Sequence, residues 1–193
     1  MDGKLVAWGR AVKSAGRGKT RIPPLWLFTD AHRLPNPAAA VARLPAGLCG
    51  VVFRHDGVAG RAALGMQLAR ICRARRIALV VAGDWRLAAA LGAGQHLRGG
   101  RGRARGRGIT TSSAHSLAEL HRARRAGAQL AFLSPAFVTA SHPGAAGLGA
   151  VRWLALARRA GGGMAVAALG GIDGTTIRRL RGCRAAGAIG ALA

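Results

Sequence analysis

Eight short apolar runs recur along the chain, and patterns with helical spacing lie between most of them. The apolar runs cover residues 25–28, 50–54, 78–82, 95–97, 109–111, 130–134, 165–169 and 188–192. Helical spacing is clearest in residues 60–75, 117–126, 148–160 and 175–183. Strands that alternate with helices form parallel sheets, because each helix carries the chain back to the start of the next strand. The alternation therefore predicts an α/β protein with one parallel sheet.

The number of strands favours a closed sheet. Eight strands indicate a (β/α)8 TIM barrel, and 193 residues would make it a minimal one, because such barrels have a lower limit of about 200 residues. The alternative is the doubly wound open sheet, which usually carries a glycine-rich turn after its first strand. Residues 29–32 read Thr-Asp-Ala-His and hold no such turn, so the barrel is the predicted fold.

The two ends of the chain lie outside the repeating pattern. The sequence stops directly after the eighth run, so we expect a barrel (residues 25–193) that lacks its final helix and leaves part of its wall uncovered. A partner subunit or a lost helix would each explain that gap, and the oligomeric state is left open. Residues 1–24 are expected to form a basic N-terminal extension. Six basic residues there interrupt any apolar segment of a secretory signal: Lys4, Arg10, Lys13, Arg17, Lys19 and Arg21.

The composition indicates the classes of partner. Thirty Lys and Arg against six Asp and Glu give a net charge of +24, which attracts polyanions such as nucleic acids, phosphorylated metabolites and anionic membranes. A general bias toward Arg, Ala and Gly explains the charge equally well. The spacing of Cys49, Cys72 and Cys183 fits neither a disulfide framework nor a zinc site. Reduced thiols in a cytoplasmic protein with no membrane span are therefore expected.

One segment, residues 98–108, has low complexity and reads RGGRGRARGRG. Its five arginines repel one another and its glycines make order costly, which favours a solvated loop. Recognition of single-stranded nucleic acid would also need aromatic side chains that stack on bases, and this segment has none. The composition therefore does not favour nucleic acid as the partner.

The ends of the apolar runs, taken in order, resemble the thiamine phosphate synthase and thiazole tautomerase family. The resemblance covers residue 25 to the C-terminus and is carried by LWLFTD (25–30), GVVFRHDG (50–57), VVAGDWRLAAALGAGQHL (80–97), TSSAHSLAEL (111–120), LSPAFVTASHPGAAGLG (133–149) and VAALGGI (166–172). It implies a (β/α)8 barrel that joins hydroxymethylpyrimidine diphosphate to thiazole phosphate and releases pyrophosphate, with Mg²⁺ on the leaving group.

The magnesium positions of that family look lost in this chain. The resemblance implies one aspartate after the third strand, where residues 82–84 read Ala-Gly-Asp, so that Asp84 is the one candidate ligand, one residue out of register. The second aspartate is implied after His96 and Leu97, where the arginine run begins instead. The family's Gln, Arg and Lys on the second strand correspond to Val52, Arg54 and Asp56, so only Arg54 is kept.

The phosphate-binding positions match better. The resemblance implies ligand contacts from Arg54, Ser113, Thr139 and Ser141, and it puts His142 where a lysine binds pyrophosphate. Gly170 and Gly171 match the glycines whose N–H groups hold the thiazole phosphate, an arrangement that needs the close approach glycine allows. The barrel mouth should therefore collect these loops into one anion site.

Plain structural roles compete with several of these assignments. His96 and His115 fit satisfied structural histidines, Asp56 fits an ion-pair partner of Arg54, and Ser116 fits a helix N-cap with Glu119 completing a capping box. Three functions remain open: a divergent thiamine phosphate synthase that binds or couples its phosphorylated small molecules, a tautomerase-like or binding barrel, and an arginine-driven nucleic-acid binder. The tautomerase reading implies a histidine after the sixth strand, where Ser134 and Pro135 stand.

Overall fold

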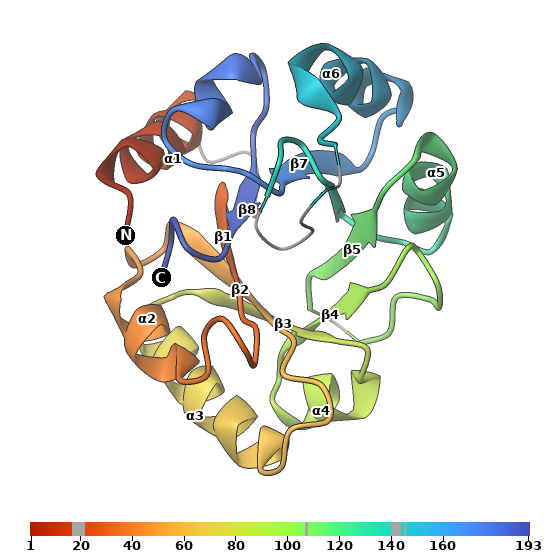
Figure 1. Cartoon of the computed structure of the whole chain (residues 1–193). Coiled ribbons are helices and arrows are strands. Elements are labelled where there is room, and N and C mark those ends of the chain that lie inside the picture. The colour runs from red at the N-terminus through yellow and green to blue at the C-terminus, as the bar shows by residue number, and fades with distance from the viewer. Residues whose placement is uncertain (17–21, 107, 140–143, 145) are drawn as a thin grey trace.

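The computed structural model describes residues 1–16, 22–106, 108–139, 144 and 146–193. Eight parallel strands pair in chain order, and β8 pairs with β1, so the sheet closes into a barrel (Figure 1). The strands are β1 Leu25–Phe28, β2 Cys49–Phe53, β3 Ala78–Ala82, β4 Gly94–Leu97, β5 Thr110–Ala114, β6 Leu130–Leu133, β7 Ala165–Leu169 and β8 Ala186–Ala188. The predicted TIM-barrel fold is confirmed.

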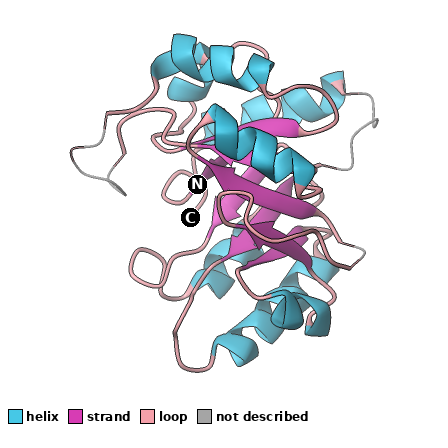
Figure 2. Cartoon of the chain, turned by 90° about the vertical axis from the view of Figure 1, so that its right-hand side faces the viewer, coloured by secondary structure: helices cyan, strands magenta, loops and turns pink. Residues whose placement is uncertain are grey.

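Helices surround the strands (Figures 1 and 2). They are α1 Gly3–Ala15, α2 Pro37–Arg43, α3 Arg61–Ala74, α4 Trp85–Ala90, α5 Leu117–Arg125 and α6 Gly149–Arg159. The link between β7 and β8 holds only a 3₁₀ helix, η1 Thr176–Arg179, where the spacing predicted a longer helix over 175–183. In the part of the chain that the structure describes, none of these helices is long and apolar enough to cross a membrane.

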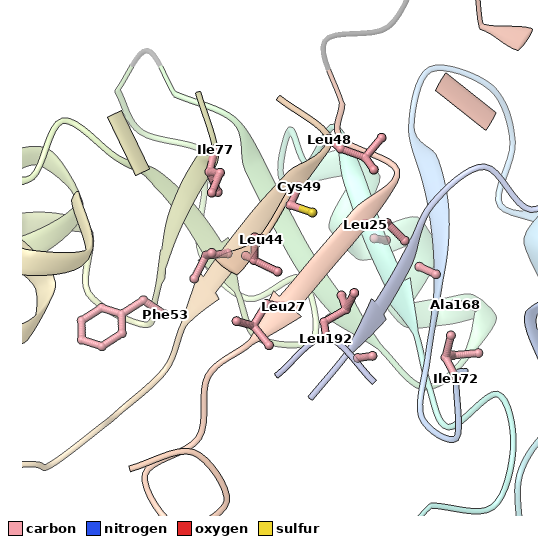
Figure 3. Packing of buried hydrophobic residues seen from close by; sticks show 14 of the residues in the cluster. Leu25, Leu27, Leu44, Leu48, Cys49, Phe53, Ile77, Ala168, Ile172 and Leu192 are labelled. Atoms are coloured by element: carbon pink, nitrogen blue, oxygen red, sulfur yellow. The ribbon is translucent and has the colours of Figure 1, made fainter. Parts of the chain in front are cut away.

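Side chains alternate between the barrel interior and the layer under the helices, as the two-residue period of a strand requires. Inside, Phe132 packs edge-on against Trp26 and Phe28, with ring centroids 5.7 and 4.7 Å away. Outside, residues such as Leu25, Leu27 and Phe53 form the larger core beneath the helices (Figure 3). Val52 on β2 faces the interior, and residues two positions apart on a strand point to the same side. Arg54 therefore also points inward, at the barrel mouth.

Helix α1 covers the wall between β8 and β1 that the sequence predicted to be open. In the ring of helices it lies between η1 and α2, where a helix following β8 would belong (Figure 1). Leu5 is fully buried, and a side chain at Gly9 would collide with Leu25 of β1. Asp2 caps the helix, and its Oδ2 also accepts a 2.7 Å hydrogen bond from the Gly174 N–H. The wall is closed by a helix from the N-terminal segment.

The three cysteines are buried and unpaired, as predicted. Burial raises the pKa of Cys49 and of Cys72 to about 12, and that of Cys183 to about 11. These thiols stay protonated at neutral pH and belong to the core.

Candidate functional site

A cavity of about 890 Å³ opens at the carboxyl ends of the strands. Loops that follow β1, β2, β5, β6, β7 and β8 contribute to its wall, because the strand ends of a barrel meet at one face. Polar and glycine residues on that wall include Arg33, Arg54, His115, Ser134, Thr139, Gly170, Gly171, Asp173, Thr176 and Arg179. Its volume suits a small metabolite.

Two glycines after β7 bring this loop against the loop after β6. Gly170 and Gly171 have φ of 91° and 63°, a region that other residues rarely adopt. A Cβ on Gly170 would lie 2.9 Å from Cα of Pro135, and one on Gly171 would collide with the carbonyl oxygen of Val138. The backbone N–H of Phe137 donates a 3.0 Å hydrogen bond to the Gly170 carbonyl. Glycine is therefore required for both the backbone angle and the close approach.

Arg54 stands at the end of β2, on the cavity wall, in a fixed orientation. Its Nε donates to the Thr29 carbonyl at 2.9 Å, and its NH2 group pairs with Asp30 at 2.8 Å. The guanidinium also lies 5.6 Å from the centroid of the Phe28 ring. Burial lowers the pKa of Arg54 from its usual value, and Asp30 and Asp56 oppose that shift. The sequence proposed Asp56 as its partner, whereas the structure pairs it with Asp30.

His115 extends from β5 toward β6 on the same wall. Its Nδ1 donates to the Ser134 carbonyl at 2.9 Å and lies 3.3 Å from the Ser134 hydroxyl. Because a carbonyl oxygen only accepts, this bond requires the tautomer with the proton on Nδ1, in which Nε2 is the acceptor. A histidine is thus present beside position 134, although it comes from the neighbouring strand.

The structure brings together some of the predicted site residues. Arg54, Thr139, Gly170 and Gly171 all line the cavity. Ser113 is not on the cavity wall. Its Oγ accepts a 3.0 Å hydrogen bond from the Gly99 N–H and anchors the loop after β4. Ser141 and His142 lie outside the described residues.

Two cationic residues of the cavity were missed by the sequence analysis. Arg33 lies in the loop after β1, and Arg179 lies in η1 with its guanidinium 4.9 Å from the Phe137 ring centroid. The one feature of the sequence that points to these two arginines is their place after a strand, because the loops after the strands build the mouth of a barrel.

The histidine inside the barrel has a structural role, as predicted. His96 is buried against Phe28 and Phe132, and its Nδ1 lies 2.8 Å from the Thr111 hydroxyl. Burial, supported by the charges of Arg54 and Arg98, lowers the pKa of His96 to about 3. The ring is neutral and satisfies one hydrogen bond in the core.

The carboxylates that follow the strands are all engaged within the chain. Asp84 caps α4 by accepting from the Leu87 N–H at 2.9 Å, and it also pairs with Arg61 at 3.5 Å. Asp56 pairs with Arg61 and with Arg98. The remaining four carboxylates are Asp2, Asp30, Glu119 and Asp173, and each accepts hydrogen bonds within the chain. Among the described residues, no group of three or more His, Cys, Asp and Glu side chains could hold a metal ion.

Ser116 is the N-cap of α5, as predicted, whereas Glu119 bonds one residue earlier than the predicted capping box requires. The Ser116 Oγ accepts from the Glu119 N–H at 3.2 Å, and Glu119 accepts from the His115 N–H at 2.8 Å. The first bond satisfies an N–H group of the first turn of α5, and the second holds the N–H of His115, the residue before the N-cap. They also fix the backbone from which His115 reaches the cavity.

Comparisons with known proteins agree with this fold. The sequence profile of the thiamine monophosphate synthase family matches residues 25–191, and no curated protein gives a significant match. Among solved structures, thiamine phosphate pyrophosphorylase from Pyrococcus furiosus superposes with a TM-score of 0.69 at 21% identity, over 86% of this chain and 84% of that one. The citrate synthase SbnG superposes with a TM-score of 0.59 at 12% identity, over 96% and 90% of the two chains.

The fold and the cavity define a (β/α)8-barrel protein with a ligand-sized space among the loops after its strands. The structural similarities, at these identities, support the fold alone. The family profile covers most of the sequence, and the protein therefore belongs to the thiamine monophosphate synthase family.

Proposed function

We propose that this protein binds a thiazole phosphate and a hydroxymethylpyrimidine diphosphate in its cavity and couples them with release of pyrophosphate. The observation that carries the proposal is the convergence of Arg54, Thr139, Gly170 and Gly171 on one cavity of about 890 Å³. Backbone N–H groups of a glycine turn and a partly buried guanidinium are strong donors to phosphate oxygens. Arg33 and Arg179 add positive charge to the same wall.

The direct test is a coupling assay with both substrates, in which thiamine phosphate and pyrophosphate are separated by chromatography. We expect both products in equal amounts. Binding of thiazole phosphate by calorimetry is measured in parallel with the parent and with Thr139→Ala, which should bind it more weakly. Thiazole phosphate that binds without any product would reduce the function to ligand binding, and no binding of either substrate would refute the proposal.

A second candidate, proton transfer on a thiazole phosphate, is favoured by His115. Its ring lines the cavity and presents Nε2 as an acceptor, because Nδ1 is held by Ser134. The test is deuterium exchange into thiazole phosphate, followed by NMR, with the parent and His115→Gln. Exchange at equal rates in both proteins would exclude this candidate.

A further inference from the structure

Arginine and aspartate side chains form ion pairs with one another at the ends of β1 to β4, beside the main cavity. Arg54 pairs with Asp30 at 2.8 Å, and Arg98 pairs with Asp56. Arg61, at the start of α3, contacts Asp56 at 3.2 Å and Asp84 at 3.5 Å. The carboxylates at this edge of the barrel are thus all joined to guanidinium groups.

Arg61 is the centre of this arrangement and is fixed from several sides. Its side chain is only 16% exposed, its NH2 group donates to the Ala82 carbonyl at 2.8 Å, and its guanidinium lies 5.5 Å from the Phe53 ring centroid. Asp56 follows β2 and Asp84 follows β3, so one guanidinium bridges the ends of two neighbouring strands. A planar guanidinium can contact two carboxylates at once because it presents five donors in fixed directions.

A divalent cation would compete with these arginines for the same oxygens. Magnesium in phosphate-binding sites is usually held by one or two carboxylates together with the phosphate oxygens. Any magnesium ion bound by Asp56 and Asp84 would have to displace Arg61 from both. Arg61 and Arg98 together already supply two positive charges, which is the charge of one such ion.

The arginine cluster also lies where it can meet a ligand. Arg54 belongs to the wall of the main cavity, whereas Arg98 lines a second cavity of about 260 Å³. Three further arginines of the loop after β4 line this smaller cavity: Arg101, Arg103 and Arg105. That loop is anchored by hydrogen bonds from the N–H groups of Gly99 and Gly100 to Ser113 and Ser112 at 3.0 and 2.9 Å. A diphosphate at this edge would find guanidinium groups on both sides.

We propose that Arg61 and Arg98 take the place of a divalent cation at the diphosphate end of the site, so that this protein binds a diphosphate without metal. Arg61 acts as a positioning residue that neutralises Asp56 and Asp84, and Arg98 is a direct phosphate contact. The inference rests on the proposed function, because it assumes that the site receives a diphosphate.

The test measures binding of inorganic pyrophosphate to the full chain by calorimetry, first with excess chelator and then with millimolar magnesium. We expect the two dissociation constants of the parent to agree within about twofold. Arg61→Gln should bind about tenfold more weakly in chelator, and magnesium should restore its affinity, since Arg61 then no longer occupies Asp84 and Oδ1 of Asp56. Arg98→Gln should weaken binding in both conditions, and the matched control Arg70→Gln, on the exposed face of α3, should not.

A second readout follows the metal alone. Binding of Mn²⁺, measured by its electron paramagnetic resonance signal, should be absent in the parent and present in Arg61→Gln. If Arg61→Gln fails to fold, Arg98→Gln decides: an unchanged pyrophosphate affinity in that variant overturns the proposal. Parent protein that binds pyrophosphate only with magnesium also overturns it, while coupling activity in the same buffer would leave the proposed function intact. Absence of pyrophosphate binding in both conditions refutes the inference. Thiazole phosphate binding, measured separately, then tests the rest of the proposed function.

Discussion

Arg54 makes a structural contact and is proposed to bind the ligand, and the two roles can be separated experimentally. We predict that Arg54→Ala weakens binding of a phosphorylated ligand by tenfold or more, because a charged hydrogen bond contributes about 1.5–3 kcal/mol. Stability should fall by only about 1 kcal/mol, since the pair with Asp30 is partly exposed and screened by solvent. Calorimetric titration and urea unfolding measure the two effects. An equal loss of affinity in Arg70→Ala would mean that general surface charge, rather than this contact, binds the ligand.

His96 makes stability depend on pH. Its pKa is about 3 in the folded protein against 6.5 for an ordinary histidine, so below pH 6.5 the unfolded chain takes up a proton that the folded chain does not. We predict that stability is full above pH 6.5 and falls toward pH 3, by up to about 1.4 kcal/mol per pH unit from this residue. His55, whose pKa is also lowered by burial, adds a loss of the same sign.

The measurement for His96 is the urea midpoint between pH 7 and pH 4 in the parent and in His96→Gln. The variant should lose part of the slope, whatever its stability at pH 7. Parallel profiles for the two proteins would show that His96 titrates in the folded state as it does in the unfolded chain.

Gly171 tests how tightly the loops after β6 and β7 are packed against each other. We predict that Gly171→Ala costs more stability than Gly163→Ala, because both have positive φ but only Gly171 faces the Val138 carbonyl. The backbone penalty alone is about 1–2 kcal/mol, and Gly163, with open space around it, isolates this part. Thermal unfolding compares the variants. Equal losses would mean that the loop after β6 moves away at no cost.

Among the elements, those with sharp apolar boundaries were predictable from sequence. β1, β3 and β7 have the predicted limits, and a polar residue or a glycine follows each of them: Thr29, Gly83 and Gly170. β8 was predicted at 188–192 but is Ala186–Ala188. Residues 185–193 are nearly uniform in Ala, Gly, Ile and Leu, so the strand position is set by its pairing with Leu25 and Leu169 on its neighbours. Such pairing is not visible in the run itself.

Site prediction was limited in the same physical way. Arg54, Thr139 and the glycines after β7, which line the cavity, were identifiable because each lies in a local segment that resembles the family. The bridge that Arg61 makes between Asp56 and Asp84 has no local signal, since its members come from a helix and two different strand ends. The pairing of Arg54 with Asp30 likewise joins residues 24 positions apart. Contacts of this kind form only because the closed sheet brings neighbouring strand ends together.

Helix α1 shows that tertiary packing can stabilise a helix whose sequence carries only a weak helical pattern. Its buried residues are only Leu5, Val6 and Gly9, and the rest of the helix is mostly polar or partly exposed. We predict that Leu5→Ala lowers the free energy of unfolding by about 2–5 kcal/mol, as for other fully buried leucines. Arg10→Ala, an exposed position on the same helix, should change it by less than about 0.5 kcal/mol. Urea unfolding distinguishes the two, and similar values would mean that α1 does not stabilise the barrel.

At the scale of the whole molecule, the charge is very uneven. The six carboxylates all accept hydrogen bonds or form ion pairs within the chain. Thirty Lys and Arg against these six acids give a net charge of +24 at pH 7. Such a protein attracts any polyanion, so weak binding to nucleic acid would not by itself establish a nucleic-acid function.

Salt and mutation together separate general attraction from recognition in the cavity. We predict that binding to duplex DNA falls steeply with salt, with a slope of about −0.9 for each phosphate contacted, whereas thiazole phosphate binding depends on salt only weakly. Changing Arg101, Arg103 and Arg105 to Gln should reduce the DNA slope and leave thiazole phosphate affinity unchanged, because these arginines line the smaller cavity. Thr139→Ala should weaken thiazole phosphate binding and leave the salt dependence of DNA binding unchanged. Calorimetry and fluorescence anisotropy over a salt series measure both ligands. DNA binding that resists salt and responds to Thr139→Ala would instead make the barrel mouth a nucleic-acid site.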